Sequence, residues 1–158
     1  IIDVLKGVAA VMIARALGAD DWLVGMAGLF VVLGHSFSPY LAFKGGKGVA
    51  TSFGVALGVA WLPALITFGL WLALVAPTRL VSLGSICGAA ALPILVYAFD
   101  PGRPELVVPL VALAIIVIGR HNENIERLLR GEENRFGAPR PGAAVGADQR
   151  PEEGDADE

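Results

Sequence analysis

The sequence predicts an all-α integral membrane protein, a polytopic helix bundle. Of its 158 residues, 55% are hydrophobic and 17% are charged, whereas soluble domains carry about 25% charged residues. The apolar residues form long runs between short polar breaks, with no internal repeat and no strand-like alternation. Helices satisfy their backbone hydrogen bonds within one segment, so we expect such runs in lipid to be helical.

The apolar runs give the order of the expected helices, at about 4–18, 22–36, 48–76, 80–99 and 106–119. The third run is long for one span of about 20 residues and short for two. Trp61, Leu62 and Pro63 lie near its middle, and proline disfavours helix at the residue before it. We therefore expect a turn near Pro63 between two short helices, 48–61 and 63–76, and six transmembrane helices in this chain.

The distribution of charge supports this turn. With it, ten of the twelve Lys and Arg residues lie at one face of the membrane. Only Arg15 and Arg103 lie at the other face, beside the acidic residues of two loops (Asp20, Asp21, Asp100 and Glu105). Cytoplasmic loops are enriched in Lys and Arg, so we expect the lysine-rich face to be cytoplasmic.

The two ends of the chain differ from its body. We expect a transmembrane domain over 1–137 and a disordered acidic tail of Pro, Gly and Ala over 138–158, because such a tail cannot bury enough apolar surface to order itself. The sequence begins with Ile1 inside an apolar pattern and shows no signal peptide, so we expect that an N-terminal segment precedes it. Cys87 lies in an apolar run and is expected to pack between helices.

A glycine-lysine loop carries the strongest functional signal. Lys44, Gly45, Gly46, Lys47 and Gly48 precede an apolar helix, so its positive N-terminal end and the exposed N–H groups face the loop. These features predict an anion site, with phosphate as the expected ligand. The loop is not a Walker A motif, because Gly48 stands where that motif needs Ser or Thr. The alternative is a flexible basic loop that touches anionic lipid head groups.

Two other polar clusters fall at the same face. Helical spacing places His121, Asn124 and Arg127 along one side of a segment, where they could relay protons and pair with an anion. A juxtamembrane amphipathic helix is the alternative. Asp3 and Lys6 are either a plain intrahelical pair or hold the anion loop in place.

Other classes of function are less well supported. His35 is either a general base or a hydrogen-bonded helix end. Two distant histidines and one buried cysteine do not supply a zinc site, so no metal is expected. A transporter would need polar groups near the middle of the membrane, where this chain has almost none. A structural membrane protein with a lipid-binding loop stays an alternative.

The motifs of these clusters resemble one family, the PlsY-type membrane acyl-phosphate:glycerol-3-phosphate acyltransferases, over roughly residues 3–137. The similar stretches are Asp3-x-x-Lys6-Gly7, Gly34-His35-x-Phe37, Phe43-Lys44-Gly45-Gly46-Lys47-Gly48-Val49-Ala50-Thr51, Thr78 to Ser85, Arg120-His121-x-x-Asn124-Ile125-x-Arg127-Leu128 and Gly131-x-Glu133. The resemblance implies seven transmembrane helices and a cytoplasmic active site. The first helix and part of the first motif are expected to precede Ile1.

The resemblance also implies a reaction. A fatty acyl group passes from acyl phosphate to the 1-hydroxyl of glycerol 3-phosphate and gives lysophosphatidic acid and phosphate, the first step of bacterial phospholipid synthesis. No cofactor is expected, because the acyl phosphate is already activated. The expected partners are the two substrates and the lipid bilayer, with no nucleic acid, and we expect a monomer in the inner membrane of a bacterium.

Roles for individual residues follow from the resemblance. The loop residues Lys44, Gly45, Gly46, Lys47 and Gly48 are expected to bind glycerol 3-phosphate, with Thr51 capping or orienting the loop. Lys47 is also a catalytic candidate, with His121 and Asn124, which are expected to orient the hydroxyl or the reacting carbonyl. Either His35, His121 or the departing phosphate accepts the proton. The remaining residues are expected to support or line the substrate site (Arg127, Glu133, Asp3, Lys6 and Ser82).

Overall fold

The computed structural model describes residues 1–37 and 45–138, and these ranges contain helices and no strand. The elements are α1 (Ile2–Ala16), α2 (Asp21–Ser36), α3 (Val49–Val59), α4 (Trp61–Thr78), α5 (Val81–Phe99), the 3-10 helix η2 (Pro104–Leu106), α6 (Val107–Gly119) and α7 (Asn122–Leu129). The predicted all-helical fold is confirmed for these residues. The predicted tail lies, except for Ala138, outside them.

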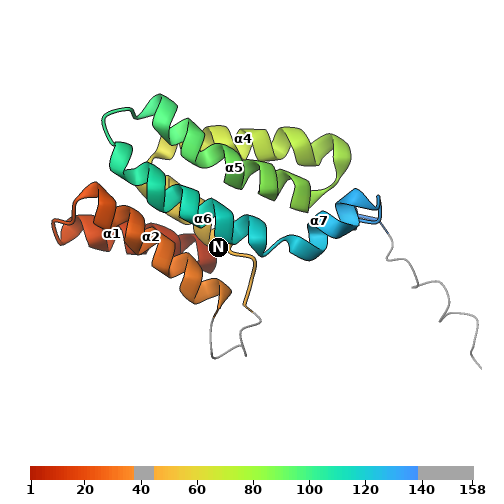
Figure 1. The fold of residues 1–158 in the computed structure, drawn as a ribbon, viewed down its shortest axis with the longest axis horizontal. Coiled ribbons are helices and arrows are strands. Elements are labelled where there is room, and N and C mark those ends of the chain that lie inside the picture. The colour runs from red at the N-terminus through yellow and green to blue at the C-terminus, as the bar shows by residue number, and fades with distance from the viewer. Residues whose placement is uncertain (38–44, 139–158) are drawn as a thin grey trace, which may run out of the picture.

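The first six α-helices form the body of the molecule, and α7 extends from one end of it (Figure 1). Helix α1 packs against α2 and α3, α4 packs against α5, and α6 contacts both α2 and α5. The core between them is aliphatic, with buried side chains such as Val11, Val32, Val55 and Leu110. Residues 45–48, the α4–α5 connection and α7 lie at one end, which we call the α7 end. The α1–α2 turn, the α3–α4 break and the α5–α6 loop lie at the opposite end.

Helices α4 and α5 are long and apolar enough to cross a membrane. A third span results if α6 with its preceding 3-10 turn is counted together with α7, across a bend of 60°. Six spans are therefore not confirmed by length and composition in the described residues. The reason is that α1, α2, α3 and α6 are each shorter than the about 20 residues of a typical span. The shortest is α3, whose 11 residues extend about 16 Å, against a hydrocarbon core of about 30 Å. Only 11% of α4 is buried, so most of its apolar side chains are exposed or half-buried.

The predicted division of the third apolar run is present, but its position differs. The break falls at Ala60, which has an extended backbone with φ −152° and ψ 91°, so the helices are Val49–Val59 and Trp61–Thr78. The predicted helices 48–61 and 63–76 placed the break two residues later than it lies. Pro63 lies in the first turn of α4, where the missing N–H of proline has no intrahelical partner to lose.

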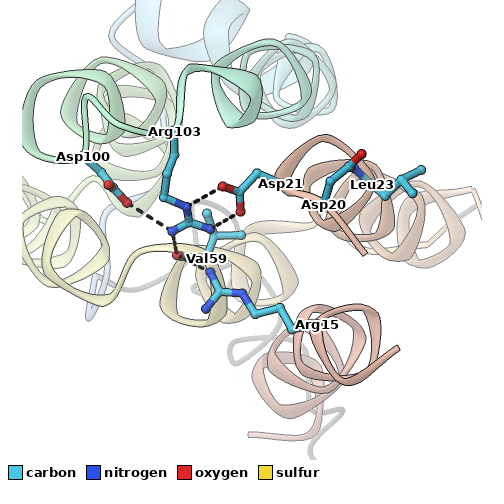
Figure 2. A network of polar contacts seen from close by, with 7 residues as sticks. All are labelled: Arg15, Asp20, Asp21, Leu23, Val59, Asp100 and Arg103. Carbon is cyan, nitrogen blue, oxygen red and sulfur yellow. Dashed lines mark hydrogen bonds and ion pairs between the residues drawn. The ribbon is translucent and has the colours of Figure 1, made fainter. Parts of the chain in front are cut away.

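Two arginines hold the end of α3 (Figure 2). The Val59 carbonyl accepts hydrogen bonds from Arg15 Nη2 and Arg103 Nη1, both at 2.9 Å. Arg103 also donates two bonds to the Asp21 carboxylate, at 2.8 and 2.5 Å, and one to Asp100 at 3.1 Å. The bond to Asp21 raises the pKa of the Arg103 guanidinium above its ordinary value. We call these five residues the Arg103 network; it confirms that Arg15 and Arg103 share one end with acidic side chains.

Glycines bring α1 and α3 into close contact. A Cβ on Gly54 would overlap the Val4 carbonyl, and a Cβ on Gly7 would overlap the Thr51 carbonyl. Small residues allow such backbone-to-backbone approach between membrane helices, where packing rather than hydrophobic burial drives association. As a result the first turn of α1 lies beside the start of α3, at the α7 end.

Candidate functional site

A cavity of about 650 Å³ lies between α3, α4, α5 and α6 and reaches the α7 end. Its walls have two different characters. At the α7 end they are polar, with Lys47, Ser82, His121, Asn124 and Glu133. The rest is mainly apolar and includes Phe53, Ala56, Phe68, Trp71, Leu92, Leu113 and Val117. The cavity can therefore hold a molecule that has a charged group at one end and a hydrocarbon portion at the other.

The polar residues form one connected cluster. Lys47 Nζ donates to Asn124 Oδ1, and Asn124 Nδ2 donates to Glu133 Oε1 at 2.6 Å. Ser82 Oγ donates to the same oxygen of Glu133 at 3.0 Å, and Arg127 Nε donates to its other oxygen at 2.9 Å. An ammonium group only donates and a carboxylate only accepts, so these partners determine the orientation of the Asn124 amide. We call these five residues the Glu133 cluster.

Glu133 is the centre of that cluster, with only 6% of its side chain exposed. Burial alone would raise the pKa of its carboxyl. Hydrogen bonds from Asn124, Arg127 and Ser82 outweigh burial and lower the pKa below its ordinary value of 4.5. Glu133 is therefore ionised at neutral pH, and its bonds stabilise the fold until the pH falls through that lowered value.

His121 is buried at the end of α6, with 2% of its surface exposed. Its Nδ1 lies 2.7 Å from the Val117 carbonyl, which can only accept, so Nδ1 carries the proton of the neutral ring. Nε2 is then left with a free lone pair, and the residue lines the cavity. Burial lowers the pKa of His121 below 6.5, helped by the nearby Lys47 charge and opposed by the Val117 bond and Glu133.

The glycine-lysine loop is held between the ends of α2 and α6. Arg120 Nη2 donates to the Gly45 carbonyl at 2.9 Å, and the same guanidinium lies 5.2 Å from the centre of the Phe37 ring. Gly48 has φ +80°, a conformation that favours glycine, and immediately precedes α3. Of the described loop residues, Lys47 lines the cavity and the three glycines do not. Lys44 lies outside the described residues.

Thr51 does not take the capping role that the motif suggested. It is the third residue of α3, completely buried, and that helix has no side-chain cap hydrogen bond. Within the described part of the chain its hydroxyl has no hydrogen-bond partner. The reason is the position of the helix start at Val49, since a capping side chain must come from the residue before the first turn.

Asp3, Lys6 and His35 form a separate cluster beside the loop. Lys6 Nζ lies 2.6 Å from Asp3 Oδ1 and 2.6 Å from His35 Nδ1. None of these three residues lines the cavity. Asp3 and Lys6 are therefore an intrahelical pair that also contacts the end of α2. Among the residues expected at the site, Lys47, Ser82, His121, Asn124 and Glu133 line the cavity, whereas Asp3, Lys6 and His35 lie behind the loop.

Several cavity residues were not predicted as site residues. Ser85 lines the cavity and accepts a hydrogen bond from Trp71 Nε1 at 3.3 Å, while Asn134, Arg135 and Phe136 follow Glu133 along its wall. The Phe136 N–H donates to the Arg79 carbonyl at 2.8 Å, which holds this segment against the α4–α5 connection. In the sequence, the polar residues Asn134 and Arg135 directly after Glu133 could have indicated this part of the wall.

Comparisons with known proteins identify the family of the chain. The family model described as glycerol-3-phosphate acyltransferase matches residues 1–131. A glycerol-3-phosphate acyltransferase of Geobacter sulfurreducens is 52% identical over 137 residues, which are 86% of this chain and 70% of that protein. The corresponding protein of Thermus thermophilus is 46% identical over 136 residues, 85% of this chain and 67% of the relative.

Two solved structures also match, both of PlsY, an integral membrane glycerol 3-phosphate acyltransferase. One is the lysophosphatidic acid form and the other the glycerol 3-phosphate form. Each has a TM-score of 0.77 and 39% identity and is matched over 85% of this chain, which covers 69% and 68% of the two PlsY chains. The resemblance in the motifs is thereby confirmed, and the chain belongs to the glycerol-3-phosphate acyltransferase family.

Proposed function

We propose that this protein transfers a fatty acyl group from acyl phosphate to the 1-hydroxyl of glycerol 3-phosphate, giving lysophosphatidic acid and phosphate. The observation that carries the proposal is the cavity, whose polar end holds Lys47, His121 and Asn124 and whose remainder is apolar. One such cavity suits a fatty acyl group joined to phosphate. The family's relatives, named for glycerol 3-phosphate and acyl transfer, support the same acceptor and reaction type.

The phosphate of the acceptor fits the glycine-lysine loop. Lys47 contributes a full positive charge, and it keeps two N–H groups beyond the one that it donates to Asn124. The start of α3 directly follows Gly48, so its free N–H groups and its helix dipole favour an anion there. In the sequence, Lys44 is a second positively charged residue of the same loop. We therefore assign glycerol 3-phosphate to this end of the cavity.

The chemistry needs orientation and charge stabilisation more than an added reagent. The acceptor hydroxyl attacks the carbonyl carbon, a C–O bond forms, and the bond to the phosphate oxygen breaks. Lys47 and the second N–H of Asn124 can stabilise the negative charge that develops on the carbonyl oxygen. The hydroxyl proton passes either to the free Nε2 of His121 or to the departing phosphate. Neither route requires a cofactor.

The hydrocarbon chain of the donor fits the apolar part of the cavity. Phe53, Phe68 and Trp71 line it, with the rings of Phe68 and Trp71 stacked at 5.9 Å between centroids. On α5 the wall runs from Ser82 to Leu92, a rise of about 15 Å along the helix. The chain would lie along this wall with its carbonyl beside the Glu133 cluster.

Gly88 offers a test of this chain position, because it lines the cavity on α5 and faces Thr67 of α4. We expect Gly88→Leu to lower kcat/KM for palmitoyl phosphate by about tenfold or more, since each displaced CH₂ loses about 0.8 kcal/mol of burial. Butyryl phosphate, whose chain ends before this point, should react at nearly the normal rate. Equal losses with both donors would contradict the assignment of the chain.

The pH dependence of the reaction should reflect the protonation of His121. The pKa of its imidazole is below 6.5, so we expect kcat/KM to stay constant down to about pH 6.5 and to fall at lower pH, when Nε2 gains a proton. Substrate phosphate groups titrate near pH 6. His121→Gln separates the two effects, because any acidic limb that it retains belongs to the substrate. An unchanged profile in that variant would argue against His121 as the titrating group.

We also propose that six helices cross the membrane with the α7 end on the cytoplasmic side of a bacterial inner membrane. The positive charges at that end and the Arg103 network at the other support this orientation. Single cysteines at Arg130 and Glu105, in a variant with Cys87→Ser, should react with a membrane-impermeant maleimide from opposite sides. Labelling of both from one side would refute the arrangement.

The decisive experiment uses the protein in lipid bilayers. It receives palmitoyl phosphate and glycerol 3-phosphate, and phosphate and lysophosphatidic acid are measured together. The two products should appear in equal amounts. Product from acyl-CoA or acyl carrier protein but not from acyl phosphate would refute the donor. No product from any donor would refute the function.

A further inference from the structure

The His35 ring lies behind the glycine-lysine loop, outside the cavity. We infer that His35 is a positioning residue: held by Lys6 and Asp3, its ring supports the backbone at Gly46 and thereby places Lys47 in the cavity. The inference rests on the proposed function for its kinetic consequences. Its structural basis is independent of that function.

Lys6 occupies one nitrogen of the His35 ring. Lys6 Nζ lies 2.6 Å from His35 Nδ1, and an ammonium group can only donate, so the lone pair of Nδ1 is occupied. The ring proton is therefore on Nε2, which leaves neither nitrogen free to accept a proton from substrate. Asp3 Oδ1 lies 2.6 Å from Lys6 Nζ and 3.6 Å from His35 Nδ1, so it balances the charge of Lys6.

The His35 ring also contacts the loop at Gly46. A Cβ on Gly46 would overlap His35 Nε2 and would lie 3.2 Å from His35 Cε1, so the edge of the ring rests against the glycine. A Cβ on Gly45 would overlap the His35 carbonyl and would lie 2.9 Å from the Ser36 carbonyl. Both glycines are therefore needed for the loop to pass this closely over the end of α2.

Lys47 connects this contact at Gly46 to the cavity. Lys47 directly follows Gly46, lines the cavity and reaches Asn124, whereas His35 does not line it. On its other side the loop is held by Arg120, which donates to the Gly45 carbonyl. Loss of the His35 ring would remove the contact at Gly46, the residue directly before Lys47. The ammonium of Lys47 would then lose its fixed position relative to Asn124.

The kinetic test compares two replacements. His35→Ala removes the ring, and we expect KM for glycerol 3-phosphate to rise about tenfold and kcat to fall as well, because a displaced Lys47 binds substrate and stabilises developing charge less well. His35→Gln keeps a carbonyl oxygen that can accept from Lys6 and an N–H that can face Gly46, yet it cannot act as a base. It should restore most of the affinity. A large loss of kcat in both variants would show that His35 is a catalytic base, which would overturn the inference.

A compensation test addresses the contact itself. Gly46→Ala places a methyl group against the ring and should raise KM, and the double variant Gly46→Ala with His35→Ala should bind better than Gly46→Ala alone. A double variant whose losses simply add would contradict the contact, because distant independent sites behave in that way.

A measurement without substrate separates failure of this inference from failure of the proposed function. Hydrogen exchange at the amides of residues 45–48 should become faster in His35→Ala and stay near normal in His35→Gln, with the α5–α6 loop unchanged in both. If the unaltered protein transfers no acyl group, the proposed function fails while this result still stands. Unchanged exchange in His35→Ala would overturn the positioning role whatever the activity.

Discussion

Replacing Lys47 with alanine is expected to lower kcat/KM for acyl transfer by about a hundredfold to a thousandfold, the usual effect of removing one group that stabilises developing charge. Lys47 is the described loop residue that reaches the cavity, and its ammonium group bonds to Asn124. Its loss removes a charge that holds substrate phosphate and a hydrogen bond that orients the amide. The measurement is phosphate release from palmitoyl phosphate in bilayers at several concentrations of glycerol 3-phosphate.

Arg130→Ala is the matched control for Lys47→Ala. It also removes one positive charge at the α7 end, but Arg130 is 67% exposed and its ion pair with Glu126 is 3.9 Å long. Its activity should stay within about twofold of normal, because exposed pairs contribute little. If Lys47→Ala only weakens binding to anionic vesicles while acyl transfer continues, the loop is a lipid-binding element. In that case the catalytic proposal is wrong.

Replacing Arg103 with alanine should destabilise the fold by about 3 kcal/mol, near the lower end for breaking a buried ion pair. The change leaves the Asp21 and Asp100 carboxylates without their partner and removes one of two donors from the Val59 carbonyl. Arg103 is 23% exposed, so water replaces part of what is lost. Thermal unfolding of the protein in mild detergent measures the effect as a lower Tm.

Two further variants calibrate the Arg103 result. Arg15→Ala removes a single hydrogen bond to Val59 and should cost about 1 kcal/mol. Arg103→Lys keeps the charge but cannot form the paired bonds to Asp21, so it should fall between Arg15→Ala and Arg103→Ala. If Arg103→Ala unfolds at the same temperature as Arg15→Ala, the network does not hold α3, α2 and the α5–α6 loop together.

The helices of this protein could be predicted from the sequence, whereas the boundary between α3 and α4 could not. Hydropathy depends on local composition, and the long apolar runs correspond to helices in the described residues. The break at Ala60 depends instead on Arg15 and Arg103, which reach the Val59 carbonyl from distant segments. Proline pointed to the wrong residue because the first turn of a helix tolerates it.

The sequence singled out five residues of the cavity wall (Lys47, Ser82, His121, Asn124 and Glu133) but not the contacts between them. Charge placement brought the loop and the residues from Arg120 onward to one end without indicating which side chains would meet. The contact of Lys47 with Asn124 joins segments 77 residues apart. The apolar part of the cavity was not predictable at all, since in the sequence Phe53 and Trp71 cannot be distinguished from apolar residues that face lipid. The position of His35 outside the cavity likewise depends on how the helices pack, which the sequence does not show.

Because one part of the cavity wall is polar and the other is apolar, the concentrations of the two substrates should be expressed on different scales. A donor whose chain occupies the apolar part is delivered from the bilayer, whereas glycerol 3-phosphate arrives from water. The quantity that governs donor saturation is then the mole fraction of acyl phosphate in the membrane, not its amount per volume of suspension. Adding inert phospholipid at a constant bulk amount of donor would slow the reaction by surface dilution. The same addition would leave saturation by the water-soluble acceptor unchanged.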